Sequence, residues 1–65
     1  SSTAYLDEIE LILNSALKET GSTIKELSDY LNLRIADVLK AAERLVSRGK
    51  AKRIQSGERI LYTSN

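Results

Sequence analysis

The chain of 65 residues contains no Cys, His, Met, Trp, Phe or Pro. Without Cys and His it cannot form a disulfide framework, a zinc site of thiolate or imidazole ligands, or a catalytic centre that relies on either side chain. No apolar run approaches the roughly 20 residues of a membrane-spanning helix, and no signal-peptide pattern is present. We therefore expect no metal, no cofactor and no membrane association.

The length also restricts the function. Sixty-five residues is less than half of the roughly 150 residues expected of a domain, so residues 1–65 are expected to form one domain with a marginal core. Such a core leaves little room for a substrate pocket, and we expect no enzyme. The chain begins with Ser rather than Met, which is expected of a processed chain or an excised domain.

Charge is unevenly distributed along the chain, although the formal net charge is only +1. Residues 1–31 carry two lysines and six acidic residues, a net charge of −4. Residues 32–65 carry eight basic and three acidic residues, a net charge of +5. This asymmetry favours a polyanionic partner for the second half of the chain.

Apolar residues at helical spacing predict three helices, at about 4–19, 24–31 and 35–48. Ser2 or Thr3 can cap the first of them.

Local signals separate these helices from one another. Gly21 is expected to end the first helix, because Gly enters the left-handed conformation without penalty. Thr23 and Glu26 match the capping box at the start of the second helix. Asn32 tolerates a turn conformation and ends that helix, and Gly49 ends the third.

The third helix has one apolar face. Six of its residues fall within an arc of about 120° on a helical wheel, the width expected of a face that packs on the core. They are Ile35, Val38, Leu39, Ala42, Leu45 and Val46.

The last segment changes to a β-like pattern and predicts a hairpin over about 51–63, with its turn at Ser56-Gly57. A three-residue loop would pair Ile54 with Ile60 and place both with Tyr62 on one face. A two-residue loop would oppose Ile54 to Arg59, which is less consistent. Tyr62 is expected to close the core beneath the hairpin, with its hydroxyl at the rim.

This order of elements, with the apolar spacing of residues 23–33 and the Gly49-Lys50-Ala51 junction, resembles the winged helix-turn-helix family over nearly the whole chain. The resemblance implies an α+β, mostly α fold. In that family the third helix usually enters the major groove of duplex DNA, and the hairpin wing touches the backbone or the minor groove. The implied positions are Arg34, Ala36, Asp37, Lys40 and Arg44 on the third helix, and Arg53, Ser56 and Arg59 on the wing.

Two subfamilies of this family are not matched. The Z-DNA-binding domains carry Asn and Tyr on the third helix and Pro-Pro in the wing, where this chain has Leu39, Glu43, Arg59 and Ile60. The small winged-helix protein of ferrous-iron transport is similar around Gly49, but it bears a wing Cys cluster that this chain lacks. The pilus-operon regulators, which have a similar size and layout, remain an open alternative because they carry no diagnostic residue to test.

Basic residues follow the elements that would meet DNA. They are Lys40, Arg44 and Arg48, at i, i+4 and i+8 on the third helix, and Lys52, Arg53 and Arg59 on the hairpin. Cations on the face opposite the core suit phosphate contact. Two other interpretations stay open: a solvated helix face that complements the helix dipole, and charges that protect a strand edge.

We therefore predict an intracellular, duplex-DNA-binding domain, such as that of a transcriptional regulator. If about five phosphates are neutralised, the affinity should fall roughly 500-fold between 50 and 200 mM salt. The alternative is a winged-helix protein-interaction module, because the third helix has few hydrogen-bonding side chains. Asp7, Glu8, Glu10 and Leu11 on the first helix would then offer a surface to a protein partner.

Overall fold

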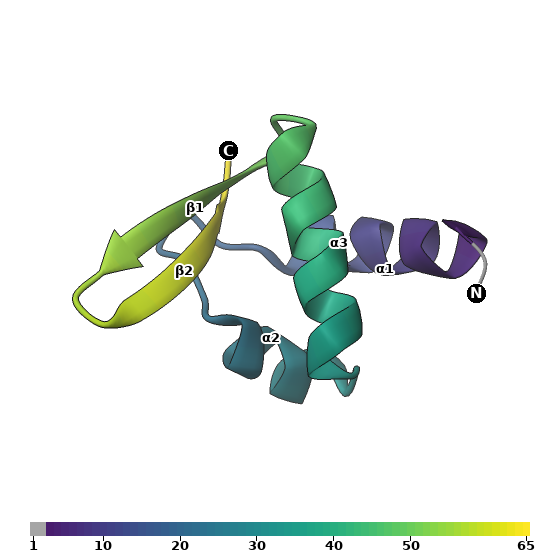
Figure 1. The fold of residues 1–65 in the computed structure, drawn as a ribbon, viewed down its shortest axis with the longest axis horizontal. Coiled ribbons are helices and arrows are strands. Elements are labelled where there is room, and N and C mark those ends of the chain that lie inside the picture. Colours follow the sequence, from purple (N-terminus) through teal and green to yellow (C-terminus); the bar gives the residue numbers. More distant parts are fainter. Residues whose placement is uncertain (1–2) are drawn as a thin grey trace.

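The computed structural model describes residues 3–65, and the prediction that Ser2 caps the first helix falls outside them. Three helices precede an antiparallel pair of strands, so the fold is α+β and mostly helical, as predicted (Figure 1). The elements are α1 (Thr3–Ala16), α2 (Ile24–Leu31), α3 (Ile35–Ser47), β1 (Ala51–Ser56) and β2 (Arg59–Ser64). Within the described residues, no helix is long and apolar enough to cross a membrane.

Helix α1 is shorter than the sequence predicted. The predicted end was about residue 19, whereas α1 ends at Ala16. After the helix, the carbonyl of Lys18 accepts the Gly21 N–H at 3.2 Å and the Ser64 N–H at 3.0 Å, which ties the segment that follows α1 to β2. Gly21 has a φ of +89° and lies against β2, so its role is to allow a close approach of two segments rather than to cap α1.

Helix α2 forms as predicted. The Thr23 hydroxyl accepts the backbone N–H of Glu26 at 3.1 Å, and the Glu26 carboxylate accepts the backbone N–H of Thr23 at 2.8 Å. The helix ends at Asn32, which adopts the left-handed conformation with a φ of 57°. Both predicted boundary signals are therefore confirmed.

Helix α3 packs most of its predicted face on the core, including the partly buried Val46, but not all of it. Val38, Ala42 and Leu45 are buried as expected, and Ala41 is fully buried with them. Ile35 and Leu39, which the helical wheel assigned to the core face, are 50% and 43% exposed. The prediction for these two residues was wrong. The buried arc is centred nearer to Ala41, which leaves Leu39 at its outer edge, and Ile35 is the first residue of the helix.

The hairpin has a different register from either one considered. Ile54 pairs with Leu61 and Ser56 with Arg59, so the two-residue turn consists of Gly57 and Glu58. Gly57 has a φ of +62°, and Gly at the first central position is typical of a type II′ turn. The predicted turn at Ser56-Gly57 was thus one residue too early.

Strand β2 lies at the centre of this end of the molecule. It pairs with β1 on one side, and on the other side Ser22 and Tyr62 exchange both backbone hydrogen bonds, at 2.8 and 3.0 Å. Tyr62 is buried at the base of the hairpin, as predicted. The buried apolar cluster joins all five elements and the residue after α1: Ile9, Leu13, Leu17, Leu27, Val38, Ala41, Ala42, Leu45, Ala51 and Tyr62. The hairpin turn extends away from this cluster (Figure 1).

Candidate nucleic-acid interface

The exposed side of α3 is concentrated in its first two turns. Arg34, Ala36 and Lys40 are exposed there, beside the exposed apolar side chains of Ile35 and Leu39. Neither Arg34 nor Lys40 forms an ion pair with any residue in 3–65. These two predicted DNA contacts are therefore directed to solvent on one helix.

The start of α3 lacks a side-chain cap. Arg34 is the N-cap residue and has the extended backbone expected there (φ −68°, ψ 140°), but its side chain makes no capping hydrogen bond. The first backbone N–H groups of α3 therefore remain available to an anion.

Asp37 is hydrogen-bonded to α1, in a pair that the charge of Arg34 also influences. It is half-buried, and its carboxylate accepts the hydroxyl of Tyr5 on α1 at 3.1 Å. This hydrogen bond raises the pKa of Tyr5, with smaller contributions from burial and from the negative charge of Asp37. Asp37 therefore joins α3 to α1, and the structure gives its carboxylate an intramolecular partner rather than an open groove.

Arg44 and Arg48 bind the acidic residues of α1. The Arg44 guanidinium lies 2.7 Å from Asp7 and 2.8 Å from Glu10, and that of Arg48 lies 2.9 Å from Glu10. Asp7 and Glu10 belong to α1 and Arg44 belongs to α3, whereas Arg48 is the C-cap residue that follows α3. The side chain of Glu10 is only 6% exposed. We call Asp7, Glu10, Arg44 and Arg48 the α1–α3 clamp.

The clamp is held by charge as much as by directed hydrogen bonds. Oε1 of Glu10 accepts a hydrogen bond from Arg48 at 2.9 Å. Oε2 of Glu10 accepts no well-aligned hydrogen bond, although it lies 2.8 Å from Nε of Arg44, and Nη1 of Arg44 is buried without an acceptor. A buried carboxylate between two guanidinium groups is costly to leave unpaired, so the clamp fixes how α1 lies on α3.

The basic row expected on α3 is thus divided. Lys40 faces solvent, whereas Arg44 and Arg48 face α1. The acidic surface expected on α1 is divided for the same reason, since Asp7 and Glu10 are used internally while Glu8 and the 71% exposed Leu11 remain at the surface.

The hairpin cations do not form one patch either. Because alternate residues of a strand point to opposite faces, Lys52 and Arg53 lie on different sides of the hairpin. Arg53 shares a face with Tyr62, and both donate to the carboxylate of Glu43 on α3. Arg59 binds Glu26 of α2 at 3.2 Å, while Ser56 is exposed beside the turn.

Glu43 is the residue that ties the hairpin to α3. The hydrogen bond from Arg53 lowers the pKa of the Glu43 carboxyl, and the hydrogen bond from Tyr62 lowers it further. Burial is the main cause that raises the pKa of Tyr62, followed by its bond to Glu43. From the sequence, Glu43 was noted only as a departure from the Z-DNA-binding domains, because nothing local signals a contact with a strand ten residues later.

Internal pairing removes much of the charge asymmetry. Three of the ion-paired arginines, Arg44, Arg48 and Arg59, bind carboxylates of residues 1–31. Subtracting every ion-paired charge leaves residues 32–65 with four basic and two acidic groups, a net charge of +2 rather than +5. The unpaired groups are Arg34, Lys40, Lys50 and Lys52 against Asp37 and Glu58. The surface left for a polyanion is therefore smaller than the sequence indicated.

Comparisons of the chain with models of protein families, with curated proteins and with solved structures found no match.

Proposed function

We propose that this chain is a winged helix-turn-helix domain that binds duplex DNA through the first half of α3, with the hairpin as the wing. The order of three helices and a hairpin is compatible with that family, and α3 has one side free of the core. The hairpin projects beside α3, where a wing would contact the duplex next to the helix (Figure 1).

The observation that carries the proposal is the pair of free cations at the start of α3. Arg34 and Lys40 are both exposed and without an ion-pair partner, and the small Ala36 between them lets a backbone come close. Together with the uncapped N–H groups of α3, they supply two charges and several donors to phosphate oxygens or base edges.

The internal ion pairs change the expected salt dependence. If only two phosphates are neutralised, the affinity should fall about 12-fold between 50 and 200 mM salt, because each phosphate contributes about −0.9 to the logarithmic slope. Five neutralised phosphates would instead give a fall in affinity of roughly 500-fold over the same salt range. Since four cations of residues 32–65 are unpaired, a slope that corresponds to more than four contacts would indicate that Arg44 and Arg48 leave the α1–α3 clamp when DNA is bound.

The test is fluorescence anisotropy with a labelled duplex across this salt range. The double variant Arg34→Gln/Lys40→Gln should lose most of the binding and most of the slope, whereas Lys25→Gln, which alters an exposed lysine already paired with Asp29, should not. Absence of binding at 50 mM salt, or a double variant that binds like the unaltered chain, rejects the proposal.

A second candidate, a protein-interaction module, rests on the apolar side chains of the same face. Ile35 and Leu39 are 50% and 43% exposed, and Ile60, on the hairpin face shared with Tyr62, is 47% exposed. Apolar exposure of this kind is typical of protein contact surfaces. Leu39→Gln separates the two functions, because it should leave duplex affinity nearly unchanged and weaken binding of a protein that covers Leu39.

A further inference from the structure

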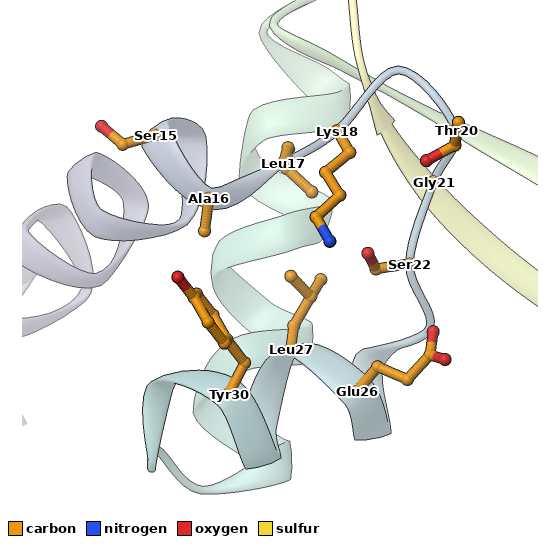
Figure 2. A pocket seen from close by; sticks show the side chains of 10 residues that line it. All are labelled: Ser15, Ala16, Leu17, Lys18, Thr20, Gly21, Ser22, Glu26, Leu27 and Tyr30. Carbon is orange, nitrogen blue, oxygen red and sulfur yellow. The ribbon is translucent and has the colours of Figure 1, made fainter.

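One cleft in the described part of the chain is not used by the function proposed above. It lies between the end of α1, the segment that follows it, and α2, and it has a volume of about 520 Å³ (Figure 2). Pockets for small molecules have volumes of about 300–1,000 Å³, so the cleft is large enough for a ring with one substituent.

The cleft offers apolar contact on two sides. Leu17 and Leu27 belong to the buried cluster and expose their remaining surface at the base of the cleft. Tyr30 extends from α2 toward Ala16 and forms a wall (Figure 2). Tyr30 is 79% exposed, so its aromatic ring can pack against a ligand ring without displacing any part of the core.

One cation reaches into the same space. The Lys18 side chain extends from the segment after α1 into the cleft, toward Leu27 and Ser22 (Figure 2). Lys18 forms no ion pair with any residue in 3–65. Glu26, at the edge of the cleft, accepts the Thr23 N–H and binds Arg59. The positive charge of Lys18 is the smallest of the causes that lower the pKa of Glu26, so Glu26 opposes this ammonium group from a distance and forms no ion pair with it.

From this combination we propose that the cleft binds a small aromatic carboxylate. The ring lies against Leu17, Leu27 and Tyr30, and the carboxylate meets the ammonium group of Lys18. The hydroxyl of Ser22 is the second donor within the cleft that can reach the anion. A neutral ring would leave Lys18 without a partner, and a small anion without a ring would not use the apolar base, so the chemistry of the cleft favours a ligand that has both.

The experiment is an amide chemical-shift titration with benzoate. For a ligand of this size we expect a dissociation constant of about 1–10 mM, with shifts concentrated in residues 15–22 and 26–30. Benzyl alcohol tests the ring without the charge, and acetate tests the charge without the ring. Both should bind several-fold more weakly than benzoate at the same residues.

Three variants locate the ligand. Lys18→Gln should weaken benzoate binding about two- to fivefold, the range of an exposed ion pair, and leave benzyl alcohol unaffected. Tyr30→Ala should weaken both ring compounds about two- to tenfold. Lys40→Gln, which removes an unpaired lysine on α3, is the control and should change nothing. Shifts located elsewhere, equal binding of benzoate and benzyl alcohol, or insensitivity to Lys18→Gln would overturn the proposal.

Discussion

The two halves of α3 carry similar residues and use them in opposite ways. The first half exposes Leu39 and Lys40 to solvent, whereas the second half buries Leu45 and directs Arg44 and Arg48 to carboxylates on α1. Both halves of this helix of 13 residues pack on the core, through Val38 in the first half and Leu45 in the second, so the halves differ in whether their cations have partners. The lesson is that a row of cations on one helix need not act as one surface, because the neighbouring helix decides which of them remain free.

The strongest test of this difference compares two leucines of the same helix. Leu45 is 2% exposed and Leu39 is 43% exposed. Leu45→Ala should lower the free energy of unfolding by about 2–5 kcal/mol, the cost of removing a buried leucine side chain, and Leu39→Ala by less than about 1 kcal/mol. Urea denaturation followed by circular dichroism measures both. Equal losses would mean that Leu39 packs in the core, as the helical wheel indicated.

The α1–α3 clamp should produce the next largest effect. Glu10→Gln keeps the size of the side chain but removes the buried charge between Arg44 and Arg48, so we expect a loss of about 1–3 kcal/mol in the free energy of unfolding. Glu8→Gln removes a neighbouring surface charge and should stay within about 0.5 kcal/mol of the unaltered chain. Similar values for the two variants would show that the clamp contributes nothing to stability.

Acid should weaken the attachment of the hairpin to α3. Since the folded protein lowers the pKa of Glu43 below its ordinary value of 4.5, the unfolded chain binds the proton more readily. The stabilisation is therefore complete above that value and is lost as the pH falls through the folded-state pKa. Glu43→Gln should flatten the pH dependence of the unfolding free energy in acid, while Lys40→Gln should not alter it.

Glu26 should contribute to the acid dependence that Glu43→Gln leaves in place. The backbone hydrogen bond from Thr23 is the main cause that lowers the pKa of Glu26. The stabilisation that Glu26 provides is therefore also lost as the pH falls through its folded-state pKa. If Glu43→Gln and the unaltered chain have parallel pH profiles, the bonds from Arg53 and Tyr62 do not stabilise the charged carboxylate.

Local signals predicted the parts of the fold that depend on neighbours in sequence. The capping box at Thr23 and the left-handed Asn32 fixed α2 to the residue, because each acts within one turn of the helix. The end of α1 was predicted too late, and the segment after it is tied to β2 by a hydrogen bond from Ser64 to the carbonyl of Lys18, a contact with the far end of the chain that has no local signal. The helical wheel failed at Leu39 for a similar reason, because the burial of Ala41 depends on which helix packs beside it.

The candidate site was predicted with the same limits: correctly where neighbours in sequence decide the outcome, and incorrectly where distant residues do. Exposure of Arg34 and Lys40 followed from the helical period, whereas the partners of Arg44 and Arg48 lie 34 to 38 residues away and have no local signature. A usable signal was present nonetheless. Two acids three residues apart on α1 match two arginines four residues apart on α3, which is the spacing expected of two helix faces that bind each other.

The smallest expected effect compares two cations of α3 directly. Arg48 is 51% exposed and binds Glu10, so Arg48→Gln should lower the free energy of unfolding by up to about 1 kcal/mol, as for other partly exposed pairs. Lys40→Gln should change it by less than about 0.5 kcal/mol. The difference in unfolding free energy between the two variants should become smaller in 1 M NaCl, where charges are screened beyond about 3 Å. A Lys40→Gln variant as unstable as Arg48→Gln would give Lys40 an intramolecular partner. Lys40 would then already be bound within the protein. Fewer than two unpaired cations would remain at the start of α3 for DNA, whereas the proposed function depends on two.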